Sequence, residues 1–167
     1  MTPATRLLEG RVILLSGVGA GLGRKLALQC AAHGARLVLG ARSGGYLDGI
    51  VEEIAASGGE AVAVPTDVAD PIACRAFVDR TLDAFGRIDG LVNSAFRFTA
   101  DNFAEADLTQ WRAAMEVSCF GGLEIAQAAL PHLRASGGCI VNVSTVGSRL
   151  GTPGSRGYNI AKGALNT

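Results

Sequence analysis

The chain has 167 residues, of which 49% are hydrophobic and 18% charged, with 15 Lys and Arg against 15 Asp and Glu. This composition argues against a disordered chain, and the length suits one domain rather than two. A formal net charge of zero gives no electrostatic reason to expect nucleic acid or an anionic membrane as a partner. No stretch has the length and apolarity of a signal peptide or a membrane span, so we expect a cytoplasmic protein.

The four cysteines, Cys30, Cys74, Cys119 and Cys139, lie far apart in the sequence. No Cys-x-x-Cys metal or redox pair is present. We therefore expect reduced, mostly buried cysteines that behave as small apolar residues, and no metal site.

Apolar runs of strand length alternate with segments of helical period. The predicted strands span residues 12–16, 36–39, 61–65, 88–93 and 139–144. The predicted helices span residues 21–33, 46–57, 70–86, 107–133 and 157–167. Asp70 before Pro71 is typical of a helix start, and Asp107 followed by Gln110 resembles a capping box.

Strands that alternate with helices predict an α/β fold with a doubly wound parallel sheet of five strands. Right-handed crossovers give the strand order 3-2-1-4-5. A ligand is then expected at the carboxyl ends of the strands, near the switch between the first and the fourth strand.

The connection between the first strand and the first helix, residues 16–23, reads Ser-Gly-Val-Gly-Ala-Gly-Leu-Gly. A helix N-terminus offers free N–H groups and a positive dipole end to a pyrophosphate, and glycines let the backbone approach it closely. A tight turn without a ligand is the alternative, but it would need one glycine and this turn has four. We therefore predict a dinucleotide site here.

The end of the second strand indicates which dinucleotide binds. NAD sites usually place an acidic residue there, whereas this chain has Ala41-Arg42-Ser43. Arg42 can pair with the 2′-phosphate of NADP, and Ser43 can add a hydrogen bond. We expect NADP(H) as the preferred cofactor and NAD(H) as the alternative; a solvated arginine at a strand end is the competing interpretation.

Tyr158 and Lys162 are four residues apart, which places them on one face of a helix. An ammonium group near a phenol stabilises the phenolate, which would make Tyr158 an effective general acid or base. The pair follows the fifth strand, at the predicted ligand edge of the sheet. Two exposed helix residues are the alternative interpretation.

From Val12 to Thr167 the chain resembles the short-chain dehydrogenase/reductases. Four segments carry the resemblance, in the order of the family: residues 16–23, 67–68, 91–96 and 158–162. They are similar to T-G-x-x-x-G-x-G with Ser for Thr, to the adenine-contacting motif after the third strand, to L-V-N-N-A-G and to Tyr-x-x-x-Lys. The resemblance implies a Rossmann-type fold and a dinucleotide cofactor.

These motifs, with the end of the second strand, give the candidate cofactor-binding residues. They are Ser16, Gly17, Gly19, Gly21, Leu22, Gly23, Arg42, Ser43, Asp67, Val68, Asn93, Ser94, Ala95, Tyr158 and Lys162.

The resemblance also implies a reaction, the interconversion of a carbonyl compound and a secondary alcohol by hydride transfer. Tyr158 would exchange the proton with the substrate oxygen, and Lys162 would assist it and hold the nicotinamide ribose. The serine of the family, thirteen residues before the tyrosine, is Thr145 here, which keeps a hydroxyl group. The asparagine in the long helix of the family is Ser118, which would support a proton relay through water.

Ser118 is one departure from the family, and the sequence departs from it in two further ways. Ser94 and Phe96 replace an asparagine and a glycine beside the cofactor, and the chain stops five residues after Lys162. We therefore expect one dinucleotide-binding domain, residues 1–167, that lacks the C-terminal part of the family fold. The strand over residues 139–144 would then be an exposed apolar edge.

Two other functions compete with a small-molecule oxidoreductase. One is a non-catalytic nucleotide-binding fragment or pairing module that lacks the substrate-binding half. The other is a related epimerase or dehydratase, against which the glycine spacing argues. As partners we expect a small carbonyl or alcohol substrate and a second copy of the chain, which would pair through the helices over residues 107–135 and 157–167.

Overall fold

The structure is a computed structural model of the chain and describes residues 6–100 and 103–167. Five strands form one sheet: β1 (Val12–Ser16), β2 (Arg36–Ala41), β3 (Glu60–Pro65), β4 (Gly90–Asn93) and β5 (Cys139–Asn142). The α-helices are α1 (Leu22–Ala32), α2 (Gly44–Ala56), α3 (Pro71–Phe85), α4 (Leu108–Met115), α5 (Gly121–Ser136), α6 (Gly147–Leu150) and α7 (Arg156–Leu165). A 3₁₀ helix, η1 (Phe103–Glu105), and a π-helix, η2 (Glu116–Phe120), complete the described elements.

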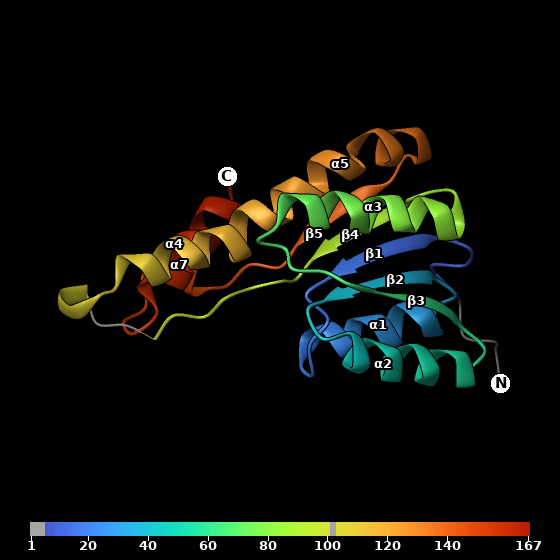
Figure 1. The fold of residues 1–167 in the computed structure, drawn as a ribbon, viewed down its shortest axis with the longest axis horizontal. Coiled ribbons are helices and arrows are strands. Elements are labelled where there is room, and N and C mark those ends of the chain that lie inside the picture. The colour runs from blue at the N-terminus through green and yellow to red at the C-terminus, as the bar shows by residue number, and fades with distance from the viewer. Residues whose placement is uncertain (1–5, 101–102) are drawn as a thin grey trace.

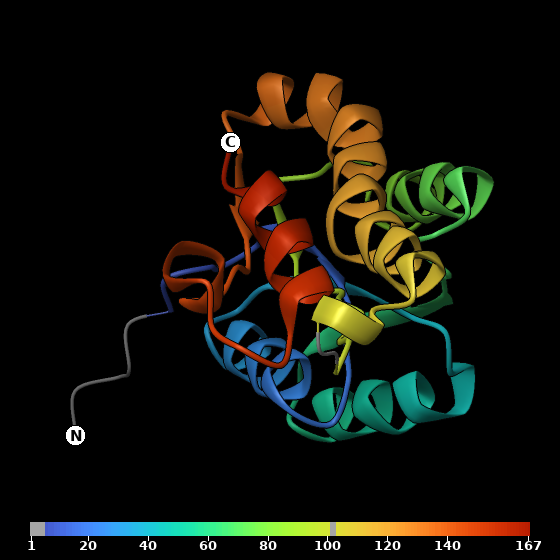
Figure 2. The ribbon, with the colours of Figure 1, turned by 90° about the vertical axis from the view of Figure 1, so that its left-hand side faces the viewer.

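The sheet has the strand order β3-β2-β1-β4-β5, and each neighbouring pair is parallel, which confirms the predicted topology. Helices α1 and α2 lie on one face of the sheet, and α3 and α5 lie on the other (Figure 1). Helices α4 and α7 pack side by side beyond the carboxyl ends of the strands (Figures 1 and 2). The edge at which a ligand was expected is therefore bordered by the helix that carries Tyr158 and Lys162.

Two hydrophobic clusters, one on each face, hold the sheet between its helices. Leu14 faces the cluster formed with α3 and α5, where Phe77 is fully buried. Ile13 and Leu15 face the opposite cluster, formed with α1 and α2. Successive side chains of a strand point to opposite faces, so the unbroken apolar run of β1 is the pattern of a strand that is covered on both sides.

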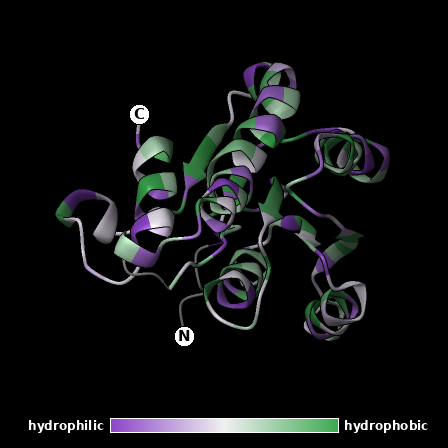
Figure 3. Ribbon diagram, turned by 60° about the vertical axis from the view of Figure 1, so that its left-hand side comes forward, coloured by the Kyte–Doolittle hydropathy of each residue, from purple (hydrophilic) through white to green (hydrophobic). Residues whose placement is uncertain are grey.

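Strand β5 lies at the edge of the sheet and is poorly covered. All four of its residues are exposed, with Ile140 at 37% and Val141 at 50%. Much of the sheet carries the hydrophobic colour in Figure 3, whereas the helices show both hydrophobic and hydrophilic faces. The expected exposed apolar edge is confirmed for the described residues, and it includes Cys139, which is exposed rather than buried.

The long helix predicted over residues 107–133 differs from the prediction. It is interrupted by the π-helix η2 and continues to Ser136. Its N-cap is Asp107, which accepts a hydrogen bond from the Thr109 N–H at 2.8 Å. The backbone N–H of Gln110 donates to the carbonyl oxygen of Asp107 at 3.0 Å, and the side chain of Gln110 accepts a hydrogen bond from Arg97 at 2.7 Å.

Some boundaries also moved. Strand β2 continues to Ala41, helix α2 begins at Gly44, β4 begins only at Gly90, and β5 ends at Asn142. Among the described residues, no helix is both long enough and apolar enough to cross a membrane.

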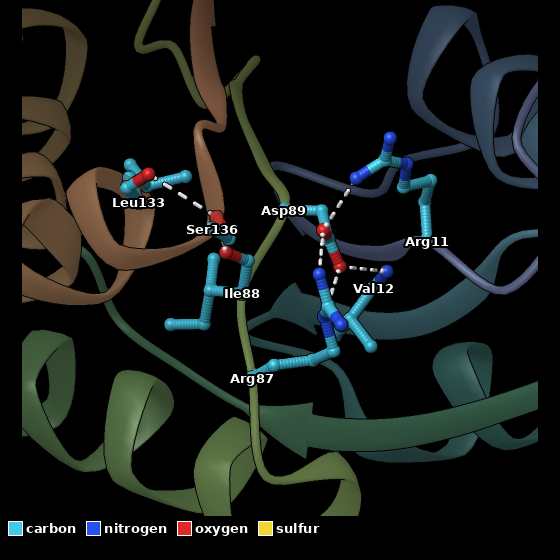
Figure 4. Close-up of polar contacts among 7 residues, drawn as sticks. All are labelled: Arg11, Val12, Arg87, Ile88, Asp89, Leu133 and Ser136. Carbon is cyan, nitrogen blue, oxygen red and sulfur yellow. Dashed lines mark hydrogen bonds and ion pairs between the residues drawn. The ribbon is translucent and has the colours of Figure 1, made fainter.

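The amino ends of β1 and β4 are joined by one buried carboxylate, that of Asp89 (Figure 4). Its side chain is 2% exposed and accepts hydrogen bonds from Arg87, from Arg11 and from the main-chain N–H of Val12. Burial alone would raise the pKa of Asp89, but these hydrogen bonds outweigh it and leave the pKa below its ordinary value. The ion pairs therefore fix the sheet at the edge opposite to the expected ligand site.

Candidate functional site

A cavity of about 680 Å³ opens beyond the carboxyl ends of β1 to β4. Its walls come from the turn after β1, the end of β2 and start of α2, the segment after β3, and the segment after β4. The sequence pointed to eight of the lining residues: Gly17, Gly19, Arg42, Ser43, Asp67, Val68, Ser94 and Ala95. Val117 of the π-helix also lines the cavity, so five separate parts of the chain converge on it at the predicted edge.

The glycines of the turn after β1 serve two different purposes. Gly17 has φ +81°, and a Cβ there would overlap the backbone of Ala95 and Ser94. A Cβ on Gly23 would lie 2.6 Å from the carbonyl oxygen of Gly17, so this glycine is also required by packing. At Gly19 and Gly21 no described atom lies within 4 Å of a Cβ position. Packing therefore does not require glycine at these two positions. A ligand that approaches the backbone closely would require it, because a side chain would block the approach.

The helix N-termini also differ in how they are capped. At α3 and α4 a side chain, Asp70 or Asp107, accepts a hydrogen bond from the first turn. At α1 and α2, which begin at the cavity, the N-caps Gly21 and Ser43 make no such side-chain bond. Neither first turn contains an acidic residue. Uncapped N–H groups and the positive end of the dipole suit a phosphate.

At the end of β2 the cavity is lined by Arg42, Ser43 and Tyr46. Arg42 is exposed, and the buried hydroxyl of Tyr46 has no hydrogen-bond partner among the described residues. A buried donor without a partner is costly, and a cation beside an uncapped helix start favours an anion. These groups fit a phosphorylated ribose at this end of the cavity. Asp67 is exposed across the cavity, and its carboxylate accepts a hydrogen bond from Ala69 at 3.0 Å.

Asn93 is buried at the end of β4 and ties three segments together instead of lining the cavity. Its amide nitrogen donates to Asn142 at 2.9 Å and to the Gly122 carbonyl at 3.1 Å. Its side-chain oxygen accepts a hydrogen bond from Ser16 at 3.4 Å. Asn93 and Ser16 thus fix the floor behind the cavity.

Helix α7 presents Tyr158 and Lys162 one turn apart. Lys162 is only 2% exposed, and its Nζ donates a hydrogen bond to the carbonyl oxygen of Ala95 at 3.2 Å. Burial lowers the pKa of Lys162 below the ordinary value for lysine, against a smaller opposing influence of Cys119. The backbone N–H of Tyr158 donates to the hydroxyl of Thr99 at 3.0 Å, so α7 is fixed to the segment after β4 at two points.

The two remaining candidate hydroxyls have defined partners. Thr145 Oγ1 accepts a hydrogen bond from the Gly147 N–H at 3.3 Å and is not hydrogen-bonded to Tyr158 among the described residues. Its neighbour Ser144 donates to the carbonyl oxygen of Lys162 at 3.3 Å. Ser118 is buried in the π-helix, and its Oγ accepts a hydrogen bond from the Arg97 N–H at 2.9 Å. Ser118 therefore bonds the segment after β4 rather than Lys162.

Several candidates are not among the residues that line the cavity. They are Ser16, Gly21, Leu22, Gly23, Asn93, Ser118, Thr145, Tyr158 and Lys162. Sequence reasoning missed other residues that line it: Val18, Ala20, Ala41, Tyr46, Thr66, Arg97 and Val117. Val18, Ala20 and Ala41 are sequence neighbours of predicted site residues, so their position in the sequence could have identified them. Tyr46 and Val117 come from helix positions that sequence alone does not direct to the cavity.

A sequence-family model described as enoyl-(acyl carrier protein) reductase matches residues 17–167. The 11-beta-hydroxysteroid dehydrogenase 1A of Arabidopsis thaliana is 38% identical over 160 residues, which are 95% of this chain and 46% of that protein. The chain thus spans about half the length of this curated relative.

Solved structures share the fold. L-sorbose reductase from Gluconobacter frateurii, complexed with NADPH and L-sorbose, superposes with a TM-score of 0.92 at 27% identity, over 97% of this chain and 62% of that chain. A short-chain dehydrogenase/reductase from Burkholderia phymatum in complex with NAD gives a TM-score of 0.91 at 29% identity, over 95% of this chain and 57% of that chain. The chain belongs to the short-chain dehydrogenase/reductase family.

Proposed function

We propose that residues 1–167 form the dinucleotide-binding domain of an NADP(H)-dependent oxidoreductase that interconverts a carbonyl compound and a secondary alcohol. The observation that carries the cofactor preference is Arg42, which lines the cavity beside the uncapped start of α2. The end of β2 has no acidic residue that could accept a hydrogen bond from the 2′-hydroxyl of an unphosphorylated ribose. NAD(H) is the alternative cofactor.

Helix α7 supplies the proton chemistry in this proposal. Tyr158 donates its hydroxyl proton to the carbonyl oxygen in reduction and accepts it from the alcohol in oxidation. The bound nicotinamide supplies or accepts the hydride. Thr145 holds the substrate oxygen through its hydroxyl group, and the ammonium of Lys162, fixed by Ala95, stabilises negative charge that develops on Tyr158.

The relatives support this class of reaction. One relative by sequence is named as a hydroxysteroid dehydrogenase, and one relative by structure is a sugar reductase complexed with NADPH.

The cofactor proposal is tested by titrating the chain with NADPH and with NADH, using energy transfer from Trp111 and calorimetry. Arg42→Gln should raise the Kd for NADPH about tenfold or more, because one charge-assisted phosphate contact is lost. The Kd for NADH should not change. Arg134→Gln, at an exposed site on the last turn of α5, is the matched control. Equal losses for both cofactors with Arg42→Gln would refute the 2′-phosphate assignment.

A non-catalytic nucleotide-binding module is the second candidate, favoured by the partners of two catalytic candidates: Thr145 is hydrogen-bonded to Gly147, and Ser118 to Arg97. It predicts saturable NADPH binding without turnover of any carbonyl compound. The two candidates therefore separate once binding and turnover are both measured.

We also propose that the chain forms a homo-oligomer through the helices over residues 107–135 and 157–167. Phe120, Leu123 and Leu130 form an exposed apolar stripe along the outside of the long helix, and Ile160 is 52% exposed on α7. Such a stripe suits a protein interface. Leu123→Lys should shift the sedimentation of the chain to the monomer, whereas Leu22→Lys, at an equally exposed leucine near the cavity, should not.

A further inference from the structure

The segment after β4 is held at every second residue. Residues 95, 97 and 99 each make a hydrogen bond to a neighbouring element. The partners are, in this order, the Nζ of Lys162, the Oγ of Ser118 and the backbone N–H of Tyr158. These three bonds hold the segment on both sides of residues 96 and 98.

The intervening side chains are Phe96 and Phe98, and their rings flank the ring of Tyr158. The centroid distances to Tyr158 are 5.8 Å for Phe96 and 5.6 Å for Phe98, with tilts of 60° and 52°. Both distances are those of favourable aromatic pairs. Three aromatic rings therefore lie together beside the proposed proton donor.

These two phenylalanines are not core residues. Phe96 is 59% exposed and Phe98 is 57% exposed, and both line the cavity. Large apolar side chains that gather at a cavity mouth mark a ligand surface more often than a random part of the exterior. The cation in this segment, the guanidinium of Arg97, is already hydrogen-bonded to Gln110 at 2.7 Å, so it does not favour an ionic substrate here.

We propose that Phe96 and Phe98 form an aromatic platform that holds the body of a flat, uncharged, apolar cyclic ketone, or of the corresponding alcohol, with its oxygen directed to Tyr158. The proposal rests on the proposed function for the reaction itself. It adds the substrate class and two substrate-positioning residues. Rings that pack on Phe96 and Phe98 gain contact area at little entropic cost, while a small polar ketone would gain almost nothing from them.

The test compares 1-tetralone, a flat cyclic ketone, with hydroxyacetone, a small polar one, on the NADPH-loaded chain. The Kd for each is measured by ligand-observed NMR, and kcat and KM are measured alongside. Phe96→Ala and Phe98→Ala should each raise the Kd and the KM for 1-tetralone about tenfold. The ratio of the Kd for 1-tetralone to the Kd for hydroxyacetone should rise about tenfold, with NADPH kept saturating for every variant.

Phe103→Ala is the matched control. Phe103 is also exposed, at 67%, and also pairs with an aromatic ring, that of Trp111 at 6.1 Å, but it lies outside the cavity. Its Kd for 1-tetralone should equal that of the wild type. Phe98→Leu keeps apolar volume without the ring and should give an intermediate loss of 1-tetralone affinity. It keeps the test valid if the alanine variant fails to fold.

The outcomes separate the platform from the reaction. Equal 1-tetralone affinity in the wild type and in both alanine variants would overturn the platform. Reduction of hydroxyacetone without any binding of 1-tetralone would also overturn it, while the proposed function would stand. Binding of 1-tetralone that depends on Phe96 and Phe98, without turnover of either ketone, would support the platform and refute the reaction.

Discussion

The Nζ of Lys162 and the carbonyl oxygen of Ala95, 67 positions apart in the sequence, are joined by a hydrogen bond of 3.2 Å. This bond connects α7 to the segment after β4, and among the described residues it is the hydrogen bond that the Nζ makes; Lys162 is only 2% exposed. A buried ammonium with so little compensation carries a desolvation cost. Its retention is therefore better explained by function than by stability.

Lys162→Met should abolish turnover and yet raise the free energy of unfolding at pH 7 by about 1 kcal/mol, because an apolar chain of similar length replaces a desolvated charge. The folded-state pKa of Lys162 lies below its ordinary value of 10.5, so the folded protein releases this proton at a lower pH than the unfolded chain. The wild type should therefore gain stability as the pH rises between these two pKa values, and the variant should lack this gain. Urea unfolding from pH 7 to 10.5 measures both; a less stable variant at pH 7 would contradict the argument.

Gly19→Ala should leave the fold intact and weaken NADPH binding about tenfold or more, because the added methyl group meets no described atom but lies where the cofactor would approach. Gly49→Ala is the control: it also meets nothing within 4 Å and lies inside α2, where alanine should stabilise the helix by about 0.5–1 kcal/mol. Calorimetric titration and thermal unfolding are measured on both. An unchanged NADPH affinity in Gly19→Ala would contradict the proposal that the cofactor binds at the glycine turn.

Thr145→Ala should lower kcat about 100-fold, because the hydroxyl proposed to hold the substrate oxygen is lost, and Thr145→Ser should restore it. Ser144→Ala removes the neighbouring hydroxyl, which bonds the Lys162 carbonyl oxygen, and should lower the free energy of unfolding by about 1 kcal/mol. Steady-state kinetics and urea unfolding are compared for the three variants. Full turnover in Thr145→Ala would exclude Thr145 from the reaction.

Asp89→Asn should cost about 2 kcal/mol of stability at pH 7, since an amide cannot accept all the hydrogen bonds that the buried carboxylate receives. The pKa of Asp89 is lowered from 3.8 in the folded protein. Its contribution is therefore fully present above about pH 4 and is lost as the pH falls through the folded-state pKa. The variant should show a smaller loss of stability in acid. Asp83→Asn, at an exposed surface pair with Arg80, should change stability by less than about 1 kcal/mol.

The strand order and the ligand edge could be predicted from the sequence because both depend on local patterns. The apolar run of β1, the glycines after it and the Asp70-Pro71 start of α3 each report their own structure within a few residues. The crossover rule then orders the strands without any knowledge of packing.

The interruption of the long helix could not be predicted in this way. Trp111, Met115 and Cys119 recur every four residues, a spacing that an uninterrupted α-helix also satisfies. The π-helix contains Ser118, whose hydroxyl bonds the backbone of Arg97, and this contact joins segments that no local pattern relates. The same holds for Phe96 and Phe98: their identities are visible in the sequence, but their pairing with Tyr158 depends on three anchors from distant elements.

The π-helix η2 also has a consequence for how insertions and deletions act in this chain. A π-turn holds about one residue more than an α-turn, and one residue corresponds to about 100° of rotation around a helix axis. The faces of α4, which packs on α7, and of α5, which packs on α3, are therefore offset in phase by this extra residue. Removing a single residue between Glu116 and Phe120 would keep the helix continuous but rotate α4 away from the helix that carries Tyr158. The length of η2, more than its composition, therefore sets the rotation of α4 relative to α5.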